Sequence, residues 1–161
     1  MNPTPQVHPI PPLFCAESRV LILGSFPSIA SREAKFFYGH PQNRFWRVMA
    51  ALNGRPVPQT VEDKTALILE NGFALWDSVA SCTVTGSSDS SIRDVVPNDL
   101  SVILDHAPIE KILCNGAASL ACYRRYIEPV THRAASALPS TSPANAAWTL
   151  ERLIEAWRVI L

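Results

Sequence analysis

In the stretch Arg19-Val-Leu-Ile-Leu-Gly-Ser-Phe-Pro-Ser28, four consecutive apolar residues lead directly into residues that stop a strand. The apolar run has the length and character of a strand buried in a sheet, and the Gly, Ser and Pro that follow it turn the chain. We therefore expect a buried strand over residues 19–23 and an open loop after it.

This loop gathers aromatic side chains in the segment Phe36-Phe-Tyr-Gly-His-Pro-Gln-Asn-Arg-Phe-Trp46, and a helical pattern follows over residues 43–53. Ligands of open α/β sheets bind in the crevice beyond the carboxyl ends of the strands. Because three adjacent aromatics at such a place exceed what packing alone explains, we expect this loop to bind a flat ring. For Phe36 and Phe37, burial in the core is an equally good explanation.

Apolar patterns in the rest of the chain alternate between strands and helices. Further strands are expected over residues 73–76, 111–114 and 133–138, and further helices over residues 61–71, 98–106, 117–127 and from Ser142, as N-cap, to the C-terminus. Residues 81–91 are rich in Ser, Thr and Gly and are expected to form a loop. The alternation predicts an α/β fold, a three-layer αβα sandwich around a central four-stranded parallel sheet.

The length of 161 residues and the hydrophobic content of 47% suit one compact domain. Residues 1–12 hold five prolines and no periodicity, so residues 1–17 are expected to form a Pro-rich N-terminal arm and residues 18–161 a single domain. No apolar run is long enough to cross a membrane, and the N-terminus lacks the features of a signal peptide. We therefore expect a cytoplasmic protein without membrane contacts.

The sequence offers no pattern for a metal or redox centre. Its four cysteines include no Cys-x-x-Cys pair, and its four histidines, His8, His40, His106 and His132, show no paired ligand spacing. We expect reduced thiols, no metal and no cofactor, and we interpret each histidine as a surface or capping residue. Gly-x-Gly-x-x-Gly, Gly-x-x-x-x-Gly-Lys-Ser/Thr and Gly-x-Ser-x-Gly are also missing, so dinucleotide, phosphate-loop and serine-hydrolase sites are not expected.

The formal net charge is zero but unevenly distributed, because residues 1–55 carry +4, residues 56–111 carry −6 and residues 112–161 carry +2. A neutral chain argues against tight, non-specific binding of nucleic acid. If the two basic ends meet in space, one face could still receive a polyanion. A solvated surface of mixed charge explains the pattern equally well.

Three motifs together resemble the uracil-DNA glycosylase superfamily. They are Leu23-Gly-Ser-Phe-Pro-Ser28, Tyr38-Gly-His-Pro-Gln-Asn-Arg-Phe-Trp46 and Leu138-Pro-Ser-Thr-Ser-Pro-Ala-Asn145. More narrowly they resemble its hypoxanthine-DNA glycosylase branch, a relative of the mismatch-specific uracil/thymine glycosylases, in the right order over nearly the whole domain from Arg19. The resemblance implies a uracil-DNA glycosylase-like fold and a monofunctional enzyme, and we expect a monomer. It would flip a deaminated base out of DNA and hydrolyse the N-glycosidic bond, leaving an abasic site.

The resemblance also assigns residues that bind the base. Tyr38 matches the ring on which the base stacks, and Ser25 and Phe26 lie in the neighbouring turn. Asp77 and Asn115, which end the second and third strands, match places from which family members read the base edge. The Asp77 carboxylate would accept from a purine N1–H or hold a backbone amide, while an ordinary turn residue is the equal alternative for Asn115.

Asn43 is the catalytic candidate, because an amide oxygen can accept a hydrogen bond from water and orient it toward an oxocarbenium-like sugar without acting as a base. The alternative is that Asn43 caps the helix that follows, and the two roles are compatible. Ser140, Thr141 and Ser142 match the second superfamily motif, whose loop presses into DNA and contacts phosphates.

Two departures from the family pattern bear on the substrate. The mismatch-specific relatives carry the water-positioning Asn within Gly-x-Asn-Pro, whereas this chain reads Gly24-Ser-Phe-Pro27. In the hypoxanthine branch that role falls to the Asn of His-Pro-x-Asn, which is Asn43 here, and this favours hypoxanthine over uracil. Leu138 stands where many relatives have His or Asn, so we expect a slower or narrower reaction. The alternatives are a mismatch-type uracil/thymine glycosylase and a non-catalytic module that binds DNA lesions.

Overall fold

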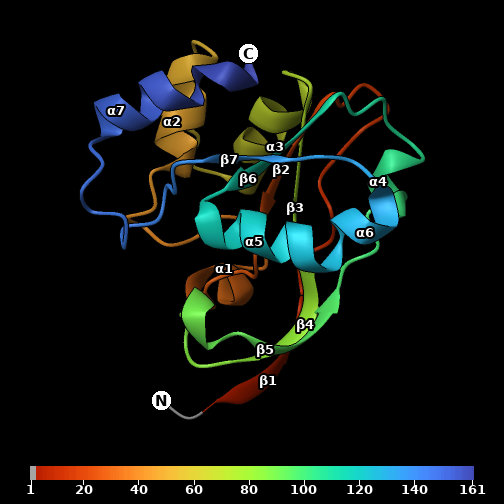
Figure 1. The fold of residues 1–161 in the computed structure, drawn as a ribbon. Helices are drawn as coiled ribbons and strands as arrows, with labels where there is room; N and C mark the ends of the chain where they lie inside the picture. The colour runs from red at the N-terminus through yellow and green to blue at the C-terminus, as the bar shows by residue number, and fades with distance from the viewer. Residues whose placement is uncertain (1–2) are drawn as a thin grey trace.

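The structure is a computed structural model that describes residues 3–161, without the side chain of Asp89. A parallel sheet in the strand order β3-β2-β6-β7 forms its centre, and a second, antiparallel sheet in the order β1-β4-β5 lies beside it (Figure 1). The strands are β1 (Thr4–Val7), β2 (Val20–Gly24), β3 (Phe73–Asp77), β4 (Val79–Val84), β5 (Arg93–Pro97), β6 (Lys111–Asn115) and β7 (Ser136–Leu138). The four-stranded parallel sheet confirms the expected fold class.

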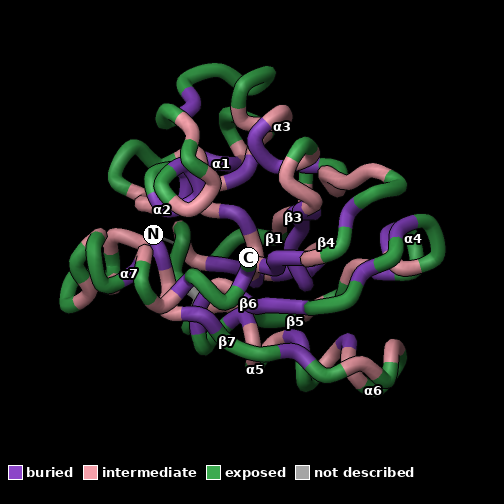
Figure 2. Tube along the Cα trace, turned by 90° about the horizontal axis from the view of Figure 1, so that it is seen from above, coloured by how far each residue is buried: buried purple, intermediate pink, exposed green. Residues whose placement is uncertain are grey.

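Helices lie on both faces of the parallel sheet. They are α1 (Ile29–Ala34), α2 (Phe45–Leu52), α3 (Val61–Leu69), α4 (Ser101–Leu104), α5 (Ala117–Tyr126), α6 (Glu128–Thr131) and α7 (Leu150–Ala156), with 3-10 turns at Asp89–Ser91 and Trp157–Ile160. Both views place α5 on one face of the sheet and α2 and α3 on the other (Figures 1 and 2). Among residues 3–161, no helix combines the length and the apolar character needed to cross a membrane.

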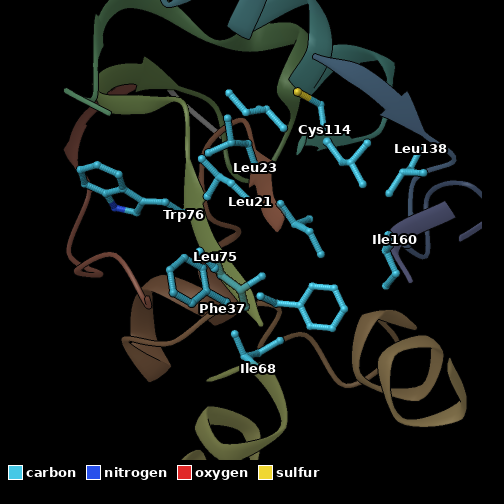
Figure 3. Close-up of a cluster of buried hydrophobic side chains, with 14 of the residues drawn as sticks. Leu21, Leu23, Phe37, Ile68, Leu75, Trp76, Cys114, Leu138 and Ile160 are labelled. Atoms are coloured by element: carbon cyan, nitrogen blue, oxygen red, sulfur yellow. The ribbon is translucent and has the colours of Figure 1, made fainter. Parts of the chain in front are cut away.

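The apolar run that opens the domain becomes the central strand. Leu21, Ile22 and Leu23 of β2 are completely buried, as expected for a strand that has a neighbour on each side and helices above and below. Figure 3 shows side chains of β2, β3 and β6 packed together with Ile68 of α3 and Ile160 near the C-terminus. This core fixes the ends of the strands, where the polar residues of interest begin.

The N-terminal segment packs onto the domain. β1 runs antiparallel to β4 over four paired residues, and the backbone N–H of His8 donates to the carbonyl of Ala80 over 2.7 Å. Ile10 is 3% exposed and belongs to the main core, and its carbonyl accepts from the indole of Trp76. Prolines suit this segment because β1 is an edge strand.

Two expected elements are wrong in the structure. The first half of the expected loop over residues 81–91 is part of β4, in which Cys82 and Val84 are buried and alternate with less buried hydroxyl residues. This half-buried alternation has the period of a strand, and its Ser and Thr content concealed it. A smaller difference is that the strands expected over residues 73–76 and 111–114 each extend one residue further, to Asp77 and Asn115.

The last helix begins at Leu150 and not after Ser142. Its N-cap is Thr149, whose hydroxyl accepts from the backbone N–H of Arg152 over 3.2 Å. The Ser142 hydroxyl accepts instead from the N–H of Ala144, within a turn. The guanidinium of Arg44 binds backbone carbonyls within residues 142–148. A helix over residues 142–149 would need these carbonyls for its own hydrogen bonds.

Candidate functional site

A cavity of about 400 Å³ lies at the carboxyl ends of the parallel strands. From β2 the chain first adds β3 on one side and then β6 and β7 on the other, so connections leave in opposite directions at this edge. Such a switch point leaves a crevice between loops. All nine residues predicted from the sequence line this cavity: Ser25, Phe26, Tyr38, Asn43, Asp77, Asn115, Ser140, Thr141 and Ser142.

The aromatic loop forms one wall of the cavity. The Tyr38 ring stacks on the buried ring of Phe45, with centroids 3.9 Å apart and planes at 20°, and Tyr38 also lines the cavity. Phe37 is buried in the core yet reaches the cavity wall, and Phe36 stacks on Trp46 at 6.1 Å. Packing therefore explains Phe36, while Tyr38 combines a packed face with a place in the cavity.

The Tyr38 hydroxyl is enclosed near two polar groups. Its oxygen is buried and makes no complete hydrogen bond with the described residues. Burial raises the pKa of Tyr38 far above its ordinary value, and the Asp77 carboxylate raises it further against a smaller lowering by Asn115. The hydroxyl therefore keeps its proton at every physiological pH and can act as a donor.

The Asn43 amide is held in a fixed orientation. Its Oδ1 accepts from the backbone N–H of Phe45 over 2.9 Å and from the Thr141 hydroxyl over 2.8 Å. The first bond satisfies the N–H of Phe45, the first residue of α2, although the N-cap is Arg44 and not Asn43 as the capping interpretation has it. Both oxygen lone pairs are thus in use, and Nδ2, which makes no hydrogen bond with the described residues, is the group left for a guest.

Thr141 joins two amides beneath the cavity. Its backbone N–H donates to Oδ1 of Asn115 over 3.0 Å, and its hydroxyl accepts from Nδ2 of Asn115 over 3.0 Å while donating to Asn43. Thr141 is completely buried, so its side chain faces the amides and not the solvent in which DNA phosphates would lie. Asn115 is accordingly more than an ordinary turn residue, because its amide fixes the loop after β7.

Ser140 and Ser142 lie at the partly exposed rim of the same loop. The Ser140 hydroxyl accepts from the N–H of Ser142, and the Ser142 hydroxyl accepts from the N–H of Ala144, each over 3.1 Å. Each hydroxyl retains its own proton to donate, which is the group a phosphate oxygen needs.

Arg44 fixes the position of this loop. Its guanidinium donates to the carbonyls of Ser142 over 2.9 Å, Asn145 over 3.0 Å and Trp148. Its backbone N–H donates to the carbonyl of Thr141 over 3.1 Å. The start of α2 and residues 141–148 therefore form one unit.

Asp77 is the acidic group of the cavity. Its Oδ2 lies 2.7 Å from Nε2 of His8, with both side chains almost completely buried. A Cβ added at Gly24 would lie 2.2 Å from Oδ1, so the carboxylate fits against β2 only because this position is glycine. Asn98 holds the backbone carbonyl of Asp77 through its side-chain amide over 2.8 Å.

Three residues at or beside the site were not predicted from the sequence. His8 contacts the cavity residue Asp77, but the sequence suggests a surface or capping residue, because His8 lies among prolines with no periodicity and far along the chain from Asp77. His40 and Ser87 line the cavity, the latter from the loop after β4. Ser87 accepts from the N–H of Ile29 over 2.9 Å, which attaches that loop to α1. No local pattern marks these long-range contacts.

Two further properties define the chemistry of the site. Among the described residues, no three His, Cys, Asp or Glu side chains are grouped as a metal site would need. Burial raises the pKa of Cys114, next to Asn115 on β6, to about 11, so this thiol stays protonated. The cavity therefore offers aromatic faces, amides, hydroxyls and one carboxylate.

Comparisons with known proteins agree with a site built from these side chains. The family described as the uracil DNA glycosylase superfamily matches residues 11–161. A hypoxanthine DNA glycosylase from Methanosarcina barkeri is 32% identical over 111 residues, which cover 68% of this chain and 70% of the relative. One from Methanosarcina acetivorans is 29% identical over 151 residues, or 93% and 94% of the two chains. The solution NMR structure of a candidate uracil DNA glycosylase from Methanosarcina acetivorans superposes with a TM-score of 0.79 at 30% identity, covering 94% of this chain and 93% of that one.

Proposed function

The chain belongs to the uracil DNA glycosylase superfamily, and from this premise we propose that it is a DNA N-glycosylase that removes deaminated bases, hypoxanthine foremost. It hydrolyses the N-glycosidic bond of the extruded nucleotide and leaves an abasic site. The observation that carries the proposal is the meeting of nine predicted residues, from loops far apart in the sequence, in one cavity. The two relatives that are named hypoxanthine DNA glycosylases support the choice of base.

Base recognition combines a ring and a carboxylate. The neutral Tyr38 ring, supported from behind by Phe45, provides a stacking surface. Asp77 accepts a hydrogen bond from the ring N–H beside the carbonyl of hypoxanthine. Adenine has a lone pair at that nitrogen and would meet the carboxylate acceptor to acceptor, so the site rejects the undamaged base.

Catalysis relies on positioning. Departure of the base leaves positive charge on the sugar, which the buried Asp77 carboxylate favours. Asn43 holds the attacking water through Nδ2, because its oxygen is used by Phe45 and Thr141. This differs from the expected use of the amide oxygen but keeps the same role, since neither amide atom acts as a base.

DNA is held by the loop after β7. Ser140 and Ser142 offer hydroxyl protons to phosphates, and Thr141 supports them from below by its bonds to the two amides. The absence of net charge on the chain suits an enzyme whose affinity comes largely from the extruded nucleotide.

The test is a glycosylase assay on duplexes that contain inosine, xanthine, uracil or a thymine mismatch, with abasic product read as alkali-labile cleavage. We expect the highest single-turnover rate on inosine. A preference for uracil or mismatched thymine would assign the mismatch-type activity instead. Binding of lesion duplexes with no product from any of them would identify a non-catalytic lesion binder.

A further inference from the structure

His8 connects the N-terminal segment to the carboxylate of the cavity. The two residues lie 69 positions apart in the sequence, and their side chains are only 3% and 7% exposed. His8 also lies outside residues 11–161, the part that the family matches. The family match therefore assigns no role to His8.

The hydrogen bonds of His8 assign its protonation state. Nδ1 accepts from the backbone N–H of Ile10 over 3.2 Å, so this nitrogen carries no proton. A neutral imidazole has one N–H, which must then be at Nε2, the atom that faces Oδ2 of Asp77. His8 is thus the donor of this contact, and the Asp77 carboxylate is the acceptor.

The imidazole is fixed on every side. β1 pairs with β4 immediately before it, and the His8 backbone N–H binds Ala80. The His8 ring lies edge-on to the rings of Phe26 and Trp76. The ring centroids are 5.9 Å and 6.4 Å from that of His8, with interplanar angles of 82° and 81°. A ring held in this way directs its Nε2–H at Asp77 before any ligand arrives.

We propose that His8 is a positioning residue that holds the Asp77 carboxylate in the orientation in which it accepts a hydrogen bond from the ring N–H of a deaminated base. This deepens the proposed function and rests on it. With Oδ2 occupied by His8 and Oδ1 against Gly24, the carboxylate has one defined orientation. The N-terminal segment is thereby part of base recognition.

The other groups around Asp77 do not replace His8. Among the described residues, the ion pairs of Asp77 include no Lys or Arg. Tyr38, from the loop after α1, faces it as a protonated hydroxyl, and Cys114, from β6, lies beyond as a protonated thiol. His8 therefore supplies the side-chain N–H that holds the Asp77 carboxylate in place.

The test uses variants at both positions. His8→Phe keeps a ring of similar shape against Phe26 and Trp76 but removes the donor, whereas His8→Gln retains an N–H near the position of Nε2. We expect His8→Phe to lower the single-turnover rate on inosine duplex at pH 7 by roughly tenfold to a hundredfold, which corresponds to one hydrogen bond to a charged group. The His8→Gln rate should stay near that of the unchanged protein, because the glutamine N–H can still hold the carboxylate.

A double-mutant cycle separates positioning from general damage to the fold. In an Asp77→Asn background, which has no carboxylate to hold, His8→Phe should cause less than a twofold further loss. An equal loss in both backgrounds would overturn the proposal. Urea unfolding of each variant checks that the compared proteins are folded.

A second measurement is independent of activity. Long-range ¹H–¹⁵N NMR correlations of the unliganded protein should show the His8 ring protonated at Nε2 and not at Nδ1. A ring protonated at Nδ1 would overturn the assignment. If the unchanged protein cleaved none of the lesions, the proposed function would fail. The same double-mutant cycle of His8 and Asp77, measured as affinity for inosine duplex, would then show whether His8 acts through the Asp77 carboxylate.

Discussion

At the scale of single residues, the Asn43 amide is both a structural and a catalytic group. We expect Asn43→Ala to lower single-turnover cleavage of inosine duplex by on the order of a hundredfold, the usual effect of removing one preorganised polar group. The control is Asn53→Ala, because Asn53 ends the same helix and, among residues 3–161, binds the carbonyl of Met49 and no cavity residue. An equal rate for Asn43→Ala and the unchanged protein would remove Asn43 from the mechanism.

The Tyr38 hydroxyl predicts a pH dependence of stability. Tyrosine in the unfolded chain ionises near pH 10, whereas burial keeps Tyr38 protonated in the folded protein. Above pH 10 the unfolded chain loses this proton and the folded chain does not, so the free energy of unfolding falls, by about 1 kcal/mol between pH 10 and pH 11.

The variant Tyr38→Phe should abolish this part of the fall, because phenylalanine does not titrate. At pH 7 it should change stability little or raise it slightly, since it removes a buried hydroxyl without a complete hydrogen bond. Urea unfolding at pH 7, pH 10 and pH 11 measures both effects, with Tyr126→Phe as the control variant. A Tyr38→Phe protein that loses as much stability in alkali as the unchanged protein would contradict the burial argument.

The family resemblance assigned the site residues, and most of them lie at or just beyond the ends of strands, where the carboxyl ends of parallel strands share an edge. Asp77 and Asn115 illustrate this, since each ends its strand. His8 could not be predicted, because its contact depends on how a Pro-rich segment returns across the domain. The two bonds to Oδ1 of Asn43 also depend on tertiary placement of Thr141.

At the scale of elements, the junction between α2 and residues 141–148 is held by Arg44. We expect Arg44→Met to lower the free energy of unfolding by about 2 kcal/mol, because it leaves three carbonyls without their charged donor. It should also weaken binding of lesion duplex more than it slows cleavage at saturating enzyme, since the loop carries Ser140 and Ser142.

Arg47→Met is the matched control, because Arg47 is exposed on the same helix. Thermal unfolding and duplex affinity measure the two effects. Identical behaviour of the Arg44 and Arg47 variants would show that the loop keeps its position without the guanidinium.

This junction also explains which elements were predicted wrongly. Ser142-Pro143 has the composition of a helix start, but local composition does not reveal that Arg44 binds carbonyls in this segment. The buried strands and the amphipathic helices were easier to predict, because their periodicity is carried by their own residues. β4 was concealed by hydroxyl side chains on its less buried positions.

At the scale of the whole molecule, the N-terminal segment contributes to the core as well as to the cavity. We expect Ile10→Ala to lower the free energy of unfolding by about 2–4 kcal/mol, because Ile10 is buried among the residues of the main core. Val7→Ala, in the same segment but 75% exposed, should change it by less than about 0.5 kcal/mol.

Urea unfolding compares the two variants. Equal stability of Ile10→Ala and Val7→Ala would mean that residues 1–17 are an appendage to an independent domain of residues 18–161, as the sequence suggests. A large loss at Ile10 alone would extend the folding unit to the start of the chain.

The pairing of β1 with β4 has a consequence for the order of events during synthesis. His8 leaves the ribosome early but has no carboxylate to bind until the chain has grown past Asp77, and β1 has no partner strand until residue 84 has followed. Contacts of such long range form late in folding. The main core also needs residues as late as Trp157 and Ile160. A translation product that stalls soon after residue 84 would therefore contain His8 and its carboxylate but lack the rest of the core and of the cavity.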